Sequence, residues 1–312
     1  NNPDQKSIAY MAVHGIPHSQ VGRIREYIKP YQFERNRRNR AMTAGLNDLI
    51  KEYGIVLDFD KDIVSVSMSH DGGTITERHI LYALSLNLIK KYGKGKDLVA
   101  FLSYKFKLGL NKKAEEYLLD SRNIYYDYDL LGVLKSDLLS KFYIPASKEC
   151  PHVLEVIELC RETGAIPAYA YLGDVGVSAT GDKKTQKFED DYLDLLFEEL
   201  IRLGFRAVTY MPSRNTKEQI QRVKALCEQH SLLQISGEDI NSPRQEFICR
   251  KLKDEELYCL KDTAWSLVGH EQLTAEGLDK AMFSKISDKT FLDLNERIKY
   301  YGYHPESHKV TF

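Results

Sequence analysis

Apolar and polar positions follow a repeated order in the second half of the chain, where a helical segment, a turn and a short apolar run occur three times. Apolar residues at helical spacing predict helices over residues 151–161, 188–203 and 217–229. Gly164 and Gly204 follow the first two helices, as glycine often does where a helix ends. The apolar runs that come next predict strands over residues 165–171, 205–210 and 232–236. This order is typical of a parallel α/β arrangement.

The first half of the chain is predicted to be mainly helical. Residues 8–13 indicate one short strand, and apolar positions recur at helical spacing over residues 21–50. Another helix is predicted over residues 77–91, with Thr74 or Thr76 as its N-cap. We therefore interpret residues 18–148 as one mainly helical subdomain, and the last 60 residues or so as helices with a polar tail.

The composition is that of an ordinary globular protein. The 312 residues are 43% hydrophobic and 29% charged, with a net charge of −1. Because the net charge is close to zero and no apolar run is long enough to span a bilayer, we expect neither a membrane nor nucleic acid as a partner. The basic stretch 34–40 is interpreted as a solvated helix face. Five cysteines without a CxxC pair favour reduced thiols and a cytoplasmic location.

Polar clusters follow all three predicted strands of the second half. They cover residues 169–174 and 180–184, then 209–216, then 235–244. In a parallel sheet these loops would lie at one edge, where their carboxylates, lysines, arginines and hydroxyls suit an anionic, polyhydroxylated ligand. Each loop alone also fits a simple turn, but three such loops together favour a binding site.

The order of these segments resembles the polymerase and histidinol phosphatase (PHP) family. Residues 164–170, GAIPAYA, resemble that family's Gly-Gly-x-x-x-x-Ala-His-Pro strand, and residues 204–214 resemble its next strand and His-Pro-Ser-His-type loop. Residues 232–241, LLQISGEDIN, are similar to the closing Leu-Leu-x-x-x-Gly-Ser-Asp-x-His. Residues 73–80, GTITERHI, resemble the Gly-Arg-His-Ile motif of a helical insert, whose basic helix matches residues 35–40. The resemblance covers roughly residues 8–242, and no motif is intact.

The resemblance implies a fold, a reaction and a cofactor. The fold would be α/β, a distorted or partial PHP-type (β/α) barrel with an inserted mainly helical subdomain. Family members bind divalent metal ions (Mn, Zn, Mg or Fe) and hydrolyse phosphate esters, since the metals polarise phosphoryl oxygens and activate water. The implied divisions of the chain are a barrel strand and turn, a helical insert, an α/β portion of the barrel and a helical extension, at residues 1–17, 18–148, 149–250 and 251–312.

The metal ligands of the family are mostly replaced in this chain. Two matched histidine positions hold Tyr169 and Asn241, a third histidine corresponds to Tyr10, and Asp239 remains. A phenol with a pKa of ~10 and a neutral amide are poor metal ligands near pH 7. The opening Asp-x-His-x-His and Thr-Asp-His motifs are absent. They would precede Asn1, and the start without Met suggests a processed or truncated chain.

Candidate site residues come partly from the loops and partly from the resemblance. The proposed ligand-binding residues are Arg78, His79, Tyr169, Lys183, Arg214, Asn241 and Arg244. The proposed metal ligands are Asp239, Glu238 and Asp174, because paired carboxylates can hold Mg²⁺ or Mn²⁺ without histidine. Arg78 and His79 fit helix capping or a surface role equally well. His14 and His18 are four apart, but Pro17 disfavours a helix that would bring them together.

Three hypotheses follow from the sequence. The first is a divergent PHP-like, metal-dependent phosphoesterase that hydrolyses a phosphorylated small molecule. The second is a non-catalytic descendant that binds an anionic or phosphorylated ligand without metal. The third is an interaction protein that uses its tyrosine-rich and helical surfaces. The sequence leaves open the catalytic residues, the substrate, metal binding, the role of residues 251–312 and the oligomeric state.

Overall fold

Residues with positive φ end the helices that precede the parallel strands. In the computed structural model, which describes residues 7–175 and 187–302, helix α6 (Val153–Thr163) ends at Gly164 (φ 74°), and α7 (Leu193–Leu203) ends at Gly204 (φ 98°). Helix α8 (Lys217–Gln229) is followed by Ser231 (φ 53°). The strands that follow are β2 (Ile166–Ala170), β3 (Ala207–Tyr210) and β4 (Leu233–Ser236). The three predicted helix–strand pairs are therefore confirmed.

The described strands form one four-stranded sheet in the order β1-β2-β3-β4. Strands β2, β3 and β4 are parallel, as predicted, with Ala168 opposite Ala207 and Ala207 opposite Leu233. Strand β1 (Met11–His14) joins the edge antiparallel to β2, with Met11 opposite Tyr169. The sheet is mixed and small, and the described strands do not form a closed barrel. The α/β class is confirmed, while the PHP-type barrel is not shown.

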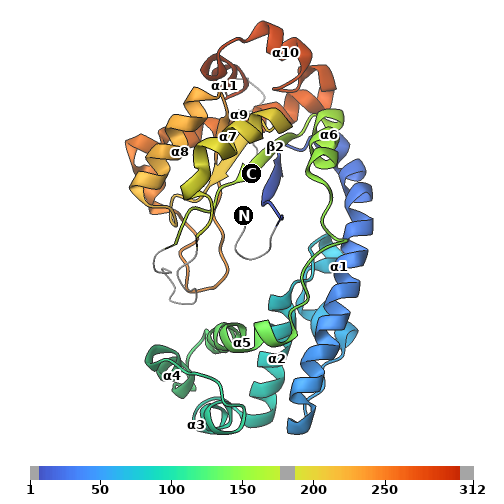
Figure 1. Ribbon diagram of the computed structural model, residues 1–312, viewed down its shortest axis with the longest axis vertical. Coiled ribbons are helices and arrows are strands. Elements are labelled where there is room, and N and C mark those ends of the chain that lie inside the picture. Colours follow the sequence, from blue (N-terminus) through green and yellow to red (C-terminus); the bar gives the residue numbers. More distant parts are fainter. Residues whose placement is uncertain (1–6, 176–186, 303–312) are drawn as a thin grey trace. The chain divides into compact units, whose positions relative to one another are not determined.

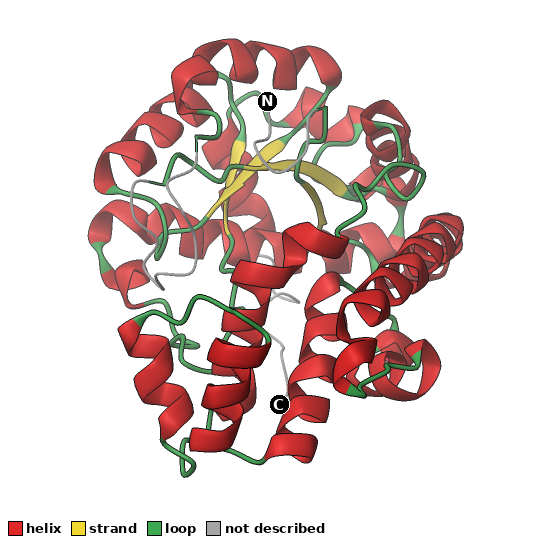
Figure 2. Cartoon of the chain, turned by 60° about the horizontal axis from the view of Figure 1, so that its bottom comes forward, coloured by secondary structure: helices red, strands yellow, loops and turns green. Residues whose placement is uncertain are grey.

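Successive residues of the strands face two separate apolar layers. Tyr169 of β2 and Val208 of β3 pack with α7 and α8 in one hydrophobic cluster. Ala168 and Ala207, one position away, pack in another cluster with α9 (Tyr258–Glu276) and α11 (Leu294–Gly302). Helices therefore cover both faces of the sheet, which Figures 1 and 2 show as strands flanked by helices. This explains why these strands are almost continuously apolar in sequence.

The chain divides into two compact units, and each is described by itself. The unit that carries the sheet, called the sheet unit here, contains Asn1–Ile28, Pro151–Ile240 and Glu246–Phe312. The second, called the helical unit, contains Lys29–Cys150 and Asn241–Gln245. Helix α1 (Val21–Ile50) contributes residues to both units. The described part of the C-terminal region contains the helices α9 and α11 and the short α10 (Lys285–Thr290).

The helical unit has its own core. After α1 its longer helices are α2 (Glu77–Tyr92), α3 (Lys96–Ala100), α4 (Lys112–Leu119) and α5 (Tyr126–Phe142). Leu46, Leu84 and Leu134 are fully buried in one cluster that these helices share. The N-cap of α2 is Thr76, one of the two predicted alternatives. No helix of the described residues combines the length and apolar character that crossing a bilayer requires.

Gly164 offers a direct test of how a helix is joined to its strand. A Cβ there would lie 2.6 Å from Cγ2 of Thr274, in backbone with φ +74°. We expect Gly164→Ala to lower the free energy of unfolding by about 2 kcal/mol, from backbone strain and overpacking. The matched control is Gly22→Ala in α1, where nothing lies within 4 Å, and we expect it to be neutral or to stabilise by up to ~1 kcal/mol. Urea unfolding of both variants measures the difference, and equal stabilities would contradict the expected crowding.

Candidate functional site

The loops that follow β2, β3 and β4 leave the sheet at the same edge. Ala170 lies opposite Thr209, and Tyr210 lies opposite Ser236, so the parallel strands end nearly level. Their carboxyl ends carry residues 171–174, 211–216 and 237–240. Ligand sites of open α/β sheets lie at this edge. The site in the sheet unit is therefore built from these loops and the chain that packs on them.

Tyr169 is bound by a buried carboxylate. Its hydroxyl donates to Oε1 of Glu189 over 2.8 Å, and the backbone N–H of Gly173 donates to Oε2 over 3.0 Å. Both side chains are buried, with exposed fractions of 8% and 3%. Burial is the main cause that raises the pKa of the Tyr169 phenol and that of the Glu189 carboxyl. The phenol therefore stays protonated near pH 7, and its hydroxyl donates a hydrogen bond to the carboxylate of Glu189.

Asp190, the residue after Glu189, also forms hydrogen bonds with the loop that follows β2. Asp190 accepts hydrogen bonds from the hydroxyl of Tyr171 and from Nε2 of Gln219, the latter over 2.7 Å. Its Oδ2 also accepts from the backbone N–H of Asp174 over 3.1 Å. The carboxylate of Asp174 in turn accepts from the N–H of Phe188 over 2.5 Å. Asp174, a predicted metal ligand, is thus part of the hydrogen bonding between loop and helix start.

Arg214, in the turn after β3, has two side-chain nitrogen atoms without a hydrogen-bond partner among the described residues. These atoms, Nε and Nη2, are buried. The guanidinium carbon lies 5.4 Å from the centroid of the buried Phe188 ring. Buried donors of a charged group are costly unless they are paired. The backbone of the turn that carries Arg214 is fixed by hydrogen bonds.

The bonds of that turn come from its own backbone and from Asn215. The N–H groups of Arg214 and Asn215 donate to the carbonyl of Met211 over 3.0 and 2.8 Å. The buried Asn215 accepts from the Met211 N–H over 3.0 Å and donates to the carbonyl of Leu172 over 2.8 Å. These bonds join the loop after β3 to the loop after β2. The backbone at Arg214 is therefore fixed relative to the loops after β2 and β3.

A small cavity lies next to these residues. Its volume is about 140 Å³. It is lined by Ile8, Ala9, Tyr10, Tyr169, Leu172, Phe188, Glu189, Tyr192 and Leu196. Phe188 thus touches both the cavity and the guanidinium of Arg214. The volume is below the ~300–1,000 Å³ of pockets for drug-sized ligands, so the cavity suits a small chemical group.

The remaining acidic candidates of the sheet unit are exposed. Glu238 accepts hydrogen bonds from the N–H and the hydroxyl of Ser213, the former over 3.2 Å. Asp239, which matches the one retained metal position, is also exposed and already interacts with another group of the protein. Over residues 7–175 and 187–302, no three His, Cys, Asp or Glu side chains are grouped so as to hold a metal ion. The described donor set does not fit the divalent metal cluster that the resemblance implied.

Other candidates lie in the helical unit. Arg78 donates from Nη1 to the carbonyl of Asn241 over 3.2 Å. His79 closes a capping box at the start of α2, where its Nδ1 accepts from the N–H of Thr76 over 3.0 Å. Burial lowers the pKa of His79, which favours this neutral, accepting form. The capping role considered for His79 is thus what the structure shows.

Arg244 is satisfied within the helical unit. Its guanidinium makes two hydrogen bonds of 2.7 Å to the carboxylate of Asp129 and lies 3.9 Å from the ring centroid of Tyr117. Tyr125 packs near the same guanidinium at 5.0 Å. An arginine held by a carboxylate and two rings is a structural anchor. Lys183 lies outside the described residues.

Sequence reasoning did not identify Glu189 or Asp190 as site residues. The signal that could have found them is the run Glu189, Asp190 and Asp191 just before the start of α7. Acidic residues are common at helix starts, where they complement the helix dipole, so the run looks ordinary in sequence. Its contact with Tyr169 and Tyr171 is visible only in the fold.

Comparisons with known proteins do not assign the chain to a family. No family model matches, and no curated protein matches. Among solved structures, the chain is similar to a proposed metal-dependent phosphoesterase from Bifidobacterium adolescentis. The two chains are 17% identical with a TM-score of 0.43, over 82% of this chain and 73% of the other. Neither value establishes a shared family.

The phenol of Tyr169 provides a test of how strongly the acidic segment is held. We expect Tyr169→Phe to lower the free energy of unfolding by about 2 kcal/mol, because Glu189 loses a donor in a buried place. The matched control is Tyr210→Phe, whose hydroxyl donates to the neutral Gln234 amide over 3.0 Å and whose loss should cost about 1 kcal/mol. Chemical unfolding at pH 7 measures both. A smaller loss for Tyr169→Phe than for Tyr210→Phe would contradict the expected strength of the carboxylate contact.

Proposed function

We propose that the sheet unit binds an anionic small molecule, through a phosphate or carboxylate group that pairs with Arg214, and that this binding requires no metal ion. The observation that carries the proposal is the buried, unpartnered Nε and Nη2 of Arg214 among the described residues. These two donors lie on one edge of the guanidinium, which matches two oxygens of a phosphate or carboxylate. The ligand would supply the hydrogen-bond acceptors that Nε and Nη2 of Arg214 lack among the described residues.

The donor set supports binding rather than metal-dependent hydrolysis. Tyr169 and Asn241 stand at matched histidine positions, and Tyr169 donates its hydroxyl proton to Glu189. Asp174 and Glu238 accept hydrogen bonds from Phe188 and Ser213. In this arrangement Arg214 would bind the anion through its Nε and Nη2 donors. The ring of Phe188 would pack against the guanidinium, and the hydrogen bonds between the two loops would fix the backbone that carries Arg214.

A calorimetric titration tests this function. The probes are inorganic phosphate, then a panel of phosphosugars and nucleotides, titrated into metal-free protein. We expect at least one of these anions to bind, and Arg214→Lys to weaken that binding at least tenfold, since a lysine keeps the charge but loses the fork. The matched control is Arg206→Lys, whose guanidinium lies 5.5 Å from the Phe283 ring but is half-exposed and paired with Asp288. No binding by any anion, or equal binding by both variants, would overturn the proposal.

The second candidate function is a PHP-like, metal-dependent phosphoesterase that acts on a phosphorylated small molecule. It is motivated by the ordered match of the three strand–loop segments, whose strands are parallel in the structure. Elemental analysis of the full-length gene product separates the two functions. Bound divalent metal, together with phosphatase activity in added Mn²⁺, would favour hydrolysis, whereas metal-free protein that still binds the anion would favour the binding function.

A further inference from the structure

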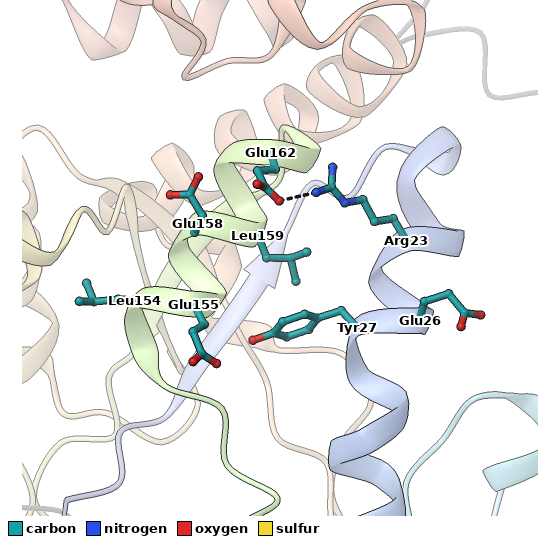
Figure 3. Close-up of a pocket in the computed structure, with 8 residues that line it drawn as sticks. All are labelled: Arg23, Glu26, Tyr27, Leu154, Glu155, Glu158, Leu159 and Glu162. Atoms are coloured by element: carbon teal, nitrogen blue, oxygen red, sulfur yellow. Dashed lines mark hydrogen bonds and ion pairs between the residues drawn. The ribbon is translucent and has the colours of Figure 1, made fainter.

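A groove lies in the sheet unit between the first turns of α1 and helix α6. Its volume is about 590 Å³. It is lined by Arg23, Glu26, Tyr27, Leu154, Glu155, Glu158, Leu159 and Glu162. Figure 3 shows the side chains of Tyr27 and Leu159 pointing toward the space between the two helices, with an ion pair joining Arg23 to Glu162 at one end. The candidate anion site does not use any of these residues.

The floor of the groove is apolar. Leu159 is buried, with 7% of its surface exposed, and Tyr27 packs against the cluster formed by Val156, Cys160 and Ala165. Leu154, at the start of α6, is 50% exposed although it is aliphatic. A further apolar side chain placed here would remove the exposed surface of Leu154 from water.

The rim of the groove is acidic. The groove is lined by the four carboxylates of Glu26, Glu155, Glu158 and Glu162 and by the one guanidinium of Arg23, so its charged side chains are mainly acidic. Arg23 pairs with Glu162 and Arg161 pairs with Glu158 at this rim, and all four side chains are about half exposed or more. Exposed ion pairs contribute little free energy, so incoming cations can replace them at small cost.

We propose that this groove docks a basic amphipathic helix of a partner protein, with an apolar residue on the Leu154–Leu159 floor and lysines or arginines against the glutamates of the rim. An apolar floor between acidic edges is complementary to such a helix. The acidic rim repels nucleic acid and anionic lipid. Because Leu154 and the rim side chains are half-exposed, a small molecule would remain largely in water, whereas small-molecule pockets bury most of their ligand.

The chain contains a close control for this groove. On α7, Leu195, Glu199 and Arg202 repeat the spacing of Leu154, Glu158 and Arg161 on α6. The leucines are 67% and 50% exposed, and each glutamate makes an ion pair with the arginine three residues later. The α7 set lines neither of the two cavities described above. The same pair of substitutions can therefore be made inside and outside the groove.

The test uses fluorescence anisotropy of the whole chain with a labelled 14-residue peptide of leucine and lysine at helical spacing. We expect saturable binding that weakens as salt is added, since exposed charges are screened. The double variant Leu154→Asp, Glu158→Lys should bind at least tenfold more weakly, and the double variant Leu195→Asp, Glu199→Lys should bind like the unmodified protein. A milder variant, Glu158→Gln with Glu162→Gln, should weaken binding severalfold and keeps the floor intact.

Three outcomes would overturn the proposal. The first is equal binding by the α6 and α7 double variants, with circular dichroism showing both folded. The second is equal binding of a leucine–glutamate peptide of the same pattern. The third is displacement of the peptide by spermine at equal concentration, which would make the groove a site for polycations without an apolar anchor.

Discussion

Replacing Arg214 with methionine is expected to stabilise the ligand-free protein and abolish its response to anions. The substitution removes the buried Nε and Nη2 donors, which have no partner among the described residues, and keeps an unbranched apolar stem beside Phe188. Since unsatisfied buried groups cost about 1–3 kcal/mol and the lost stacking on the ring offsets part of this, we expect a gain of about 1 kcal/mol in the free energy of unfolding. A residue that costs stability when the ligand is absent is typical of a binding site.

Unfolding in urea, with and without the anion found by titration, measures both effects. The control is Arg206→Met, which removes a half-exposed guanidinium and should change stability by no more than ~0.5 kcal/mol while the anion still stabilises the protein. If Arg214→Met loses stability and still responds to the anion, then Arg214 has a structural role, and the proposed function is wrong.

Lowering the pH is expected to destabilise the sheet unit through His270. This imidazole is fully buried on α9, where its Nε2 bonds to the carbonyl of Gly15 over 3.0 Å and its Nδ1 accepts from the N–H of Met282 over 3.0 Å. Burial lowers the pKa of His270 from 6.5 to about 4. Because the pKa in the folded state lies below that in the unfolded state, the stabilisation is complete above pH 6.5. It is lost as the pH falls from there toward 4.

The shift corresponds to about 3 kcal/mol in the free energy of unfolding between these pH values. Urea unfolding at a series of pH values measures it. We expect His270→Gln, which keeps a donor and an acceptor but does not titrate, to be less stable at pH 7 and to lose this component of the pH dependence. An identical pH profile for His270→Gln and the unmodified protein would contradict this account.

Local patterns were sufficient to predict most helices and strands. Helices α1 and α8 have the predicted bounds, and β2, β3 and β4 lie inside the predicted apolar runs. The strand predicted over residues 8–13 is shifted by a few residues, to Met11–His14. Periodicity and caps report which face of a segment is buried and where a helix ends, and both are properties of neighbouring residues.

The candidate site was predicted only in outline. The parallel strands place the loops that follow them at one edge, as expected, and Arg214 lies in one of these loops, but the partners of Tyr169 and Arg244 were not predicted. Tyr169 is bound by Glu189, and Arg244 by Asp129, which is 115 residues away in sequence. The sequence of a polar loop is the same whether its residues bind a ligand or form hydrogen bonds with a distant side chain of the protein. The two cases therefore cannot be distinguished before the fold is known.

The sequence by itself thus determined the α/β class, the order of helices and strands, and the loops in which a site would lie, because these depend on local spacing. Only the tertiary structure decided that β1 is antiparallel, that acidic residues before α7 satisfy the tyrosines, and that Arg214 remains unpaired among the described residues. It also placed an acidic groove between α1 and α6. Each of these depends on which distant segments meet, since the free energy of a charge or phenol is set by the partners that folding brings to it.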